Sequence, residues 1–395
     1  MVCMIKKFQN SPFFKSQNSI ITLWILLSIF AAYKQFQINR INNYLIYKNV
    51  YNHTLQQWSL YASYPNEYLD HNHYGPIFSL LIAPFAIMPD QLGCMLWNVF
   101  NAVVLVYAIK QLPLNYQKIN LILWICCHEF LTTSLSFQFN PIMTAIIILS
   151  FVKIHQEKDF WAAFFIILGT FVKIYGIVGL AFFFFSKNKL KLILSLLFWA
   201  IILFILPMFI SSKDFIIQTY FEWFDRLIVK NSENASLTSM QDISVMGMIK
   251  RVLANPDIST LPILGFGLLL FGLPYLKWKS FSDLQFRLLL LASVLLFTVI
   301  FSSGSESPTY IIAFLGVAIW YVVQEKPINT ISLFLFIFAL LLTSLSPSDL
   351  FPKYIKTHYV QPYALKALPC FLIWLKIIVE MMFIKENKPT NILDN

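Results

Sequence analysis

Apolar runs separated by short polar segments recur along the whole chain of 395 residues. With ends defined to within a few residues, the runs are 19–33, 77–88, 92–109, 119–135, 142–152, 160–171, 174–185, 190–210, 261–276, 288–301, 310–323, 328–345 and 365–384. A helix needs about 20 apolar residues to cross the hydrocarbon of a bilayer, so the longer runs predict transmembrane helices. Runs of about a dozen residues are too short for that and predict broken or re-entrant pieces beside a cavity. The pattern therefore predicts an all-α integral membrane protein with about 10–12 transmembrane helices.

Composition supports this class of protein. Of the residues, 58% are hydrophobic and only 12% are charged, and the mean hydropathy is +0.67. A soluble domain carries about 25% charged residues. The net charge of +10 comes from basic residues scattered over short segments between the apolar runs. That placement is typical of loops that face the cytoplasm and anionic lipid headgroups, so we expect membrane lipid and no nucleic acid as a partner.

The lysines in the short connections predict how the chain is oriented. With Lys6, Lys7 and Lys15 in the cytoplasm, alternate crossing collects the basic connections on the cytoplasmic face. This arrangement requires that the run 77–88 does not cross fully and that Lys173 marks a turn on the outer face. The expected organisation is a cytoplasmic N-terminus at 1–18, one polytopic domain at 19–384 and a cytoplasmic tail at 385–395, with outer loops at 34–76 and 211–260.

Several classes of function lack their motif in this sequence. The five cysteines show neither metal-site nor disulfide spacing. No nucleotide-binding, serine-hydrolase or zinc-protease motif occurs. The polar, basic start is not typical of a cleaved signal peptide, so we expect the first apolar run to remain as a span. An enzyme of this kind would have to take its activated group from the lipid phase.

The first outer segment carries side chains that suit catalysis. Asp70 and Glu67 place carboxylates at the membrane surface, where a carboxylate can deprotonate an acceptor hydroxyl. A solvated acidic loop explains them equally. His71 and His73 alternate with Asp70, which raises the possibility of a metal site, but the spacing matches no known site. We expect no bound metal, and leave open whether a divalent ion takes part in the reaction.

Charged residues at membrane depth are functional candidates by default. Lys173 interrupts an apolar stretch, and its ammonium suits a lipid phosphate; a lysine that merely reaches the interface is the plain alternative. Glu306 lies in the polar turn 302–309, which suits a sugar or phosphate and also suits a helix cap. Glu129 is explained as well by helix packing against a polar neighbour. Trp223 is interpreted as an aromatic anchor at the interface.

Short motifs follow one another in a characteristic order. They are 74–78 (YGPIF), 80–85 (LLIAPF), 88–89 (MP), 96–98 (LWN), 138–140 (QFN) and 171–176 (FVKIYG). This order resembles glycosyltransferase family 87, a family of the multi-span GT-C group, over roughly residues 20–345. The elements 305–309 (SESPT) and 346–352 (SPSDLFP) are similar to versions from bacteria of the Bacteroidetes type.

The resemblance implies a GT-C-like fold whose extracytoplasmic loops form the active site, in the inner membrane of a bacterium. It implies transfer of a hexose, typically mannose, from a polyprenyl phosphate to a glycan or glycolipid, with inversion at the anomeric carbon. The lipid-linked sugar is then a co-substrate, and no further cofactor is expected. These features are expectations from the family, not from the spacing of the residues.

The resemblance also implies roles for individual residues. Family members usually carry an acidic residue in the first outer loop that acts as the base, and many begin that loop with an aspartate followed by an aromatic residue. The matching place here reads Asn42-Asn43-Tyr44, and asparagine cannot act as a base. Asp70 becomes the best candidate for the base, with Glu67 and Glu306 behind it. The implied substrate-binding residues are Asn43, His73, Tyr74, Asn140, Lys173, Asp349, Lys353 and Lys356, of which the lysines would stabilise the departing phosphate.

Two other classes of function stay open at this point. A transporter or flippase of lipid-linked sugars should show paired broken helices in two halves and a site near the midplane of the bilayer. This sequence shows no internal repeat, and its polar residues gather at one face. A membrane scaffold without catalytic activity is the second alternative. The pattern favours the enzyme.

Overall fold

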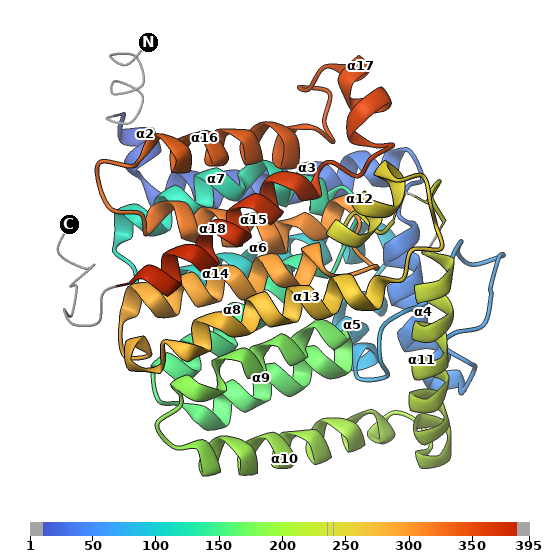
Figure 1. The fold of residues 1–395 in the computed structure, drawn as a ribbon. Helices are drawn as coiled ribbons and strands as arrows, with labels where there is room; N and C mark the ends of the chain where they lie inside the picture. The colour runs from blue at the N-terminus through green and yellow to red at the C-terminus, as the bar shows by residue number, and fades with distance from the viewer. Residues whose placement is uncertain (1–10, 235, 240, 385–395) are drawn as a thin grey trace.

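The computed structural model describes residues 11–234, 236–239 and 241–384, which form helices joined by turns. These residues include no strand, so the predicted all-α fold is confirmed. Long helices run side by side as a bundle, and shorter elements gather at one end of it (Figure 1). Residues 1–10 and 385–395, which hold Lys6, Lys7 and the expected cytoplasmic tail, lie outside the described part.

Twelve apolar helical segments of the described chain form the bundle. They are α3 (Gln17–Gln37), α6 (Asp90–Lys110), α7 (Tyr116–Ser134), α8 (Asn140–His155), α9 (Asp159–Val172), η1 (Ile174–Phe185), α10 (Lys189–Ile205) with η2 (Leu206–Phe209), α13 (Thr260–Gly272) with η3 (Leu273–Leu276), α14 (Leu284–Ile300), α15 (Tyr310–Val322), α16 (Thr330–Phe338) with η6 (Ala339–Leu345), and α18 (Ala367–Phe383). By length and composition, α3, α6 and α10 with η2 are able to cross a membrane, and most of the others are shorter apolar helices. Twelve of the thirteen apolar runs thus form helical segments of the bundle, and the number that cross a membrane stays a prediction.

Polar caps start many of these helices. Ser16, Asn115, Asn188, Asp283 and Asn329 each precede a helix, and each side chain accepts a hydrogen bond from the backbone N–H three residues further on. These bonds satisfy N–H groups that have no partner inside the helix. The same short connections carry the lysines that were used to orient the chain.

Two local features expected from the sequence occur in the structure. The run 77–88 contains α5 (Phe78–Ala86), which has 9 residues and is too short to cross a bilayer. The stretch 160–185 is not one helix, because Lys173 separates α9 from η1 in an extended conformation, with φ −152° and ψ 114°. The two halves pack against each other, so the chain turns back at Lys173.

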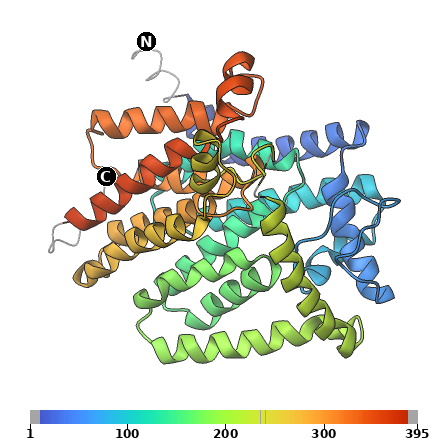
Figure 2. The same cartoon turned by 45° about the vertical axis from the view of Figure 1, so that its right-hand side comes forward.

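Both predicted outer loops instead contain helices. The first, 34–76, begins with the end of α3 and contains α4 (Asn42–Gln56). The second, 211–260, contains α11 (Lys213–Glu233) and α12 (Val245–Val252). Both α4 and α11 lie crosswise at one end of the bundle (Figures 1 and 2). Each buries one face and exposes the other, and this burial stabilises helices whose sequences are too polar to span a membrane.

Short elements complete the described fold. They are α2 (Pro12–Lys15), η4 (Trp278–Ser280), η5 (Ser307–Thr309), α17 (Lys353–Ile355) and η7 (Lys356–Val360). In Figure 1, α2 and the last turns of α18 lie at the end of the bundle opposite to α4 and α11.

An aromatic cluster underlies the end of the bundle where α4 and α11 cross. Tyr47, Tyr74, Phe78, Trp97 and Phe139 are buried and meet in edge-on and stacked contacts. The hydroxyls of Tyr47 and Tyr74 are hydrogen-bonded to each other at 3.1 Å. Such ring contacts add to the free energy gained from burial and give the cluster a fixed geometry. The cluster therefore fixes α4, through Tyr47, and the segment that ends at Tyr74 relative to the bundle.

Candidate active site

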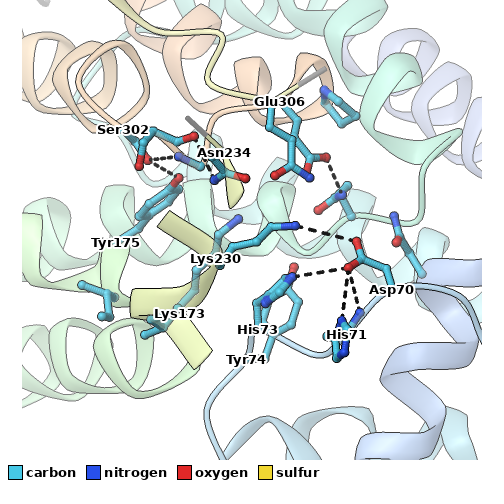
Figure 3. A pocket seen from close by; sticks show the side chains of 18 of the residues that line it. Asp70, His71, His73, Tyr74, Lys173, Tyr175, Lys230, Asn234, Ser302 and Glu306 are labelled. Carbon is cyan, nitrogen blue, oxygen red and sulfur yellow. Dashed lines mark hydrogen bonds and ion pairs between the residues drawn. The ribbon is translucent and has the colours of Figure 1, made fainter. Parts of the chain in front are cut away.

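A cavity of about 610 Å³ opens at the end of the bundle that α4 and α11 cover (Figure 3). Its volume lies within the range of small-molecule sites, about 300–1,000 Å³. Segments far apart in the sequence supply its walls: α4, the residues 70–74, Gln138, the residues 173–175, the end of α11, and the turn 302–308. The acidic, basic and histidine side chains that line it are Asp70, His71, His73, Lys173, Lys230 and Glu306.

Asp70 lies at the open side of the cavity, with 51% of its side chain exposed. The residue has a φ of 73°, in the left-handed region, and its carboxylate accepts the backbone N–H of His71 at 2.8 Å. Asp visits this region because its short side chain bonds locally. Nζ of Lys230 lies 3.8 Å from one carboxylate oxygen, and ring nitrogens of His71 and His73 each lie 3.9 Å from the other. Basic groups thus surround a carboxylate that solvent and a ligand can both reach.

Two asparagines hold the chain on either side of Asp70. The side chain of Asn42, at the start of α4, makes two hydrogen bonds of 2.7 Å with the backbone of Leu69. The side chain of Asn72 makes two bonds of 3.0 Å with the backbone of Tyr74. Asn42 therefore sits beside Asp70 and fixes its backbone, although Asn42 itself carries no base.

Gly75 seats the same segment against the end of α9. Its N–H donates to the carbonyl of Val172 at 3.1 Å. A Cβ at this position would lie 2.0 Å from the carbonyl oxygen of Phe171 and 3.1 Å from the ring of Trp223. Trp223 is buried, and its indole N–H donates to the carbonyl of His73 at 2.9 Å. The interpretation of Trp223 as an interface anchor was therefore wrong: the side chain supports the site.

We expect the change Gly75→Ala to destabilise the protein by about 1–3 kcal/mol, as overpacking of a tight contact does. The added methyl group would meet a backbone oxygen, which cannot move away without shifting the segment. Gly265→Ala is the matched control, because nothing lies within 4 Å of a Cβ there and alanine favours the α13 helix. Thermal unfolding in the same detergent measures both variants; equal unfolding temperatures would contradict the expectation.

Lys173 enters the floor of the cavity from the break between α9 and η1. Its ammonium donates to Oδ1 of Asn140 at 3.0 Å and lies 4.7 Å from the centre of the Tyr175 ring and 5.9 Å from that of Tyr74. Burial lowers the pKa of Lys173 to about 8, and the charge of Glu306 acts in the opposite direction. The side chain is therefore a cation at neutral pH, at the deep side of the cavity.

The end of α11 supplies a second cation. Lys230 has only 16% of its side chain exposed and extends over the cavity toward Asp70 (Figure 3). Asn234 donates to the carbonyl of Ser303 at 3.0 Å, and the hydroxyl of Ser303 donates to Asn231. These bonds join the end of α11 to the turn 302–309.

Glu306 faces the cavity from that turn and is the N-cap residue of η5, so the expected helix cap is present, while binding of a sugar or phosphate by this turn stays a prediction. Its backbone N–H donates to the hydroxyl of Thr309 at 3.2 Å, and the amide of Gln138 lies 3.5 Å from one carboxylate oxygen. Burial raises the pKa of Glu306, while the charges of Lys173 and Lys230 oppose that shift. Ionised Glu306 is thus held in the cavity at a cost in free energy of folding.

We expect Glu306→Gln to unfold at a higher temperature than the wild type near neutral pH. Because the pKa of Glu306 is raised in the folded chain, ionising it costs more in the folded than in the unfolded chain. Wild-type stability therefore falls as the pH rises from the usual glutamate value of 4.5 through the higher folded value. Glutamine has no such loss. The gain, measured by thermal unfolding over a pH series, should vanish below that usual value; a gain that is the same at every pH would contradict the cause.

His73 is a buried imidazole at the edge of the cavity. Burial and the charge of Lys230 lower its pKa to about 3, so the ring is neutral at any physiological pH. Within the described part of the chain, neither of its ring nitrogens has a hydrogen-bond partner. Both nitrogens are buried without a hydrogen-bond partner among those residues, so each retains an unused capacity for a hydrogen bond.

The structure brings most of the predicted site residues together. Asn43, Asp70, His73, Tyr74, Lys173 and Glu306 line the cavity, and Asn140 lies beneath it through its bond to Lys173. Asn43 donates to the carbonyl of Ser136 at 2.8 Å.

Besides Asn140, four predicted site residues do not line the cavity. Glu67 bonds the ring of His53 at 2.8 Å and is not among the residues that line the cavity. Asp349 and Lys353 are exposed, and Lys356 donates to the carbonyl of Pro347 at 2.6 Å. These three residues belong to the segment 346–360, whose α17 projects from the end of the bundle (Figure 1). The structure therefore gives no support to Glu67 as a base or to Lys353 and Lys356 as phosphate ligands.

Sequence reasoning missed several residues of the site. Lys230, Tyr175, Asn234 and Ser302 were not proposed as site residues. The hydroxyls of Tyr175 and Ser302 bond at 2.7 Å beside Lys173. The turn of α11 that holds Lys230, Asn231 and Asn234 was the available signal, because these polar residues are three and four apart and share one helix face.

No grouping of three His, Cys, Asp or Glu side chains suited to a metal occurs among the residues that the structure describes. The expectation that the site holds no metal stays a prediction.

This arrangement suits proton abstraction coupled to the departure of an anion. A reachable carboxylate can take a proton, and buried ammonium groups can stabilise a developing negative charge. Ile174 and Leu227 also line the cavity, and the helix η1 exposes apolar side chains such as Ile177 beside it. A ligand with a polar head and an apolar tail matches both surfaces.

Two comparisons with known proteins bear on the chain. The family model described as glycosyltransferase family 87 matches residues 72–303, more than half of the sequence. The match includes Lys173 and Lys230 and begins just after Asp70. A search of curated proteins finds no match.

Proposed function

Because the chain belongs to glycosyltransferase family 87, we propose that it moves a hexose, of the mannose type, from a polyprenyl phosphate to a glycan or glycolipid. The reaction would take place at the extracytoplasmic face of a bacterial inner membrane, with the N-terminus in the cytoplasm. The observation that carries the proposal is the cavity in which a reachable carboxylate, Asp70, lies across from a buried ammonium, Lys173.

The proposed step is a single displacement. Asp70 takes the proton of an acceptor hydroxyl as its oxygen forms a bond to the anomeric carbon of the donor. The bond from that carbon to the phosphate oxygen breaks, and polyprenyl phosphate leaves with the electron pair. Attack from the face opposite to the leaving group inverts the anomeric configuration. Lys173, with Lys230 at the other side of the cavity, stabilises the negative charge of the departing phosphate.

Remaining cavity residues would bind the sugars. In this proposal, Glu306 accepts hydrogen bonds from sugar hydroxyls, and neutral His73 bonds a hydroxyl through a free ring nitrogen. The lack of a nucleotide-binding motif and the apolar border formed by Ile174 and Leu227 both support a lipid-linked donor. The partners are then lipid-linked sugar and a glycan or glycolipid.

The donor class can be tested with the purified full chain in lipid nanodiscs. Polyprenyl-phosphate mannose and a nucleotide-linked mannose, both labelled, are offered with a set of glycan and glycolipid acceptors. We expect label to reach an acceptor from the polyprenyl phosphate and not from the nucleotide. Transfer from the nucleotide sugar, or no transfer from the lipid donor, would contradict the proposed donor.

A further inference from the structure

A buried ion pair lies directly behind the turn that carries Glu306. Lys366, immediately before α18, has 4% of its side chain exposed, and Glu129, in α7, has 0%. Nζ of Lys366 lies 3.1 Å and 3.3 Å from the two carboxylate oxygens of Glu129. The pair joins parts of the chain that are 237 residues apart in the sequence.

The same ammonium also holds the turn. Nζ of Lys366 donates to the backbone carbonyl and to the hydroxyl of Ser307, both at 3.1 Å, and lies 4.9 Å from the centre of the Tyr310 ring. Ser307 follows Glu306 and itself lines the cavity. The backbone of Lys366 is fixed in turn, since its carbonyl accepts the hydroxyl of Thr343 at 2.9 Å.

Stability alone does not account for such a pair. The desolvation of two charges offsets most of their attraction, and apolar side chains of similar volume are often as stable or more so. What apolar side chains would remove is the hold on Ser307. The bonds from α11 reach the turn at Ser303, and the N–H of Ile243 donates to the carbonyl of Ser305 at 2.9 Å. Lys366 holds the turn at Ser307, on the other side of Glu306.

We propose that Lys366, oriented by Glu129, is a positioning residue that sets the direction in which Glu306 faces the cavity. Lys366 does not touch the substrate in this proposal; it acts through the turn 302–309. The expected change in kcat rests on the proposed function, because kcat is measured as sugar transfer. The expected loosening of the turn 302–309 when the ion pair is removed does not depend on that function.

The test replaces the whole pair, Glu129→Leu with Lys366→Met, so that no unpaired charge stays buried. The matched control is Lys376→Met with Glu380→Gln, which removes a second ion pair of 2.9 Å from α18, away from the cavity, and keeps an acceptor for the indole N–H of Trp320. We expect both double variants to unfold within a few degrees of the wild type. The first should lower kcat about 100-fold, as a misplaced catalytic geometry does, and the control less than about twofold.

A coupling measurement separates positioning from a general structural role. Glu306→Gln should lower kcat in the wild type, but in the Glu129→Leu, Lys366→Met background it should add less than about twofold, because residues that act through one another are not additive. Wild-type kcat in the pair variant, or full additivity with Glu306→Gln, would overturn the proposal.

Hydrogen exchange at residues 302–309 gives a readout that needs no donor. We expect amides there to exchange at least about tenfold faster in the pair variant than in the wild type, because the turn opens locally more often. If the pair variant fails to fold, hydrogen exchange is measured on the single variant Glu129→Gln instead. Glutamine keeps a hydrogen-bond acceptor for Lys366 but removes the negative charge that orients it. Unchanged exchange in the variant that folds would overturn the proposal. Wild-type protein that transfers no sugar would instead contradict the proposed function and leave the exchange result standing.

Discussion

Replacing Asp70 by asparagine is expected to lower kcat for sugar transfer by about 100- to 10,000-fold, the range that a general base contributes. Asparagine keeps the shape of the side chain and can still accept the backbone N–H of His71, so the left-handed turn is preserved. It cannot accept the proton of the acceptor hydroxyl. KM for the donor should change little, because the interaction lost is made in the transition state.

The control for this variant is Asp257→Asn. Asp257 is exposed after α12 and does not line the cavity, so its carboxylate should not affect the rate. Both variants are compared in steady-state transfer assays and in thermal unfolding, which checks that each is folded. Equal kcat for Asp70→Asn and the wild type would show that Asp70 is not the base.

The second large effect is expected at Lys173. Lys173→Met should lower kcat about 100- to 1,000-fold, the cost of removing one group that stabilises transition-state charge. The side chain fills the same space but loses its ammonium, which the structure holds at the floor of the cavity through Asn140. Lys213→Met, at the exposed start of α11, removes a cation from the same end of the molecule and should leave kcat unchanged.

The wild type should also show an alkaline limb set by Lys173. Its ammonium is charged below its pKa of about 8 and neutral above it, so kcat should fall as the pH rises through that value. In the Lys173→Arg variant the side chain stays charged at higher pH. The kcat that this variant retains should therefore not fall near the pKa of Lys173. A fall at the same pH in both proteins would assign the limb to another group.

The sequence predicted the parts of the fold that depend on local chemistry. A lysine inside an apolar stretch marked the break at 173, and the short run 77–88 marked an element that does not cross. Both follow from the cost of burying charge in lipid and from the length of a helix that spans it. The helices α4 and α11 were expected as loops, because their stability comes from one buried face rather than from overall hydrophobicity.

The site was predictable only where one segment supplied the signal. Asp70, His73 and Tyr74 are close in sequence, and a carboxylate at the membrane surface is recognisable there. Lys230 reaches Asp70 only because α11 crosses the end of the bundle, a tertiary arrangement that no local pattern encodes.

The predicted site residues that lie away from the cavity were chosen from local sequence as well. Glu67 and Lys356 resemble site residues in their sequence setting, but one bonds His53 and the other bonds the carbonyl of Pro347. Residues at a water boundary look alike in the sequence whether they face a cavity or solvent. A polar neighbour was expected for Glu129. The sequence could not identify that neighbour as Lys366, because the two residues are 237 positions apart.

The most direct measurement uses sealed vesicles that contain the full chain and labelled polyprenyl-phosphate mannose, with a glycan acceptor on one side only. If the protein transfers sugar in the cavity that contains Asp70, label appears in the glycan together with an equal amount of polyprenyl phosphate. This transfer occurs only when the acceptor is on the side of the membrane that Asp70 faces. If the labelled lipid instead moves across the bilayer and no glycosylated product forms, the protein moves lipid-linked sugar, and the proposed transfer is wrong.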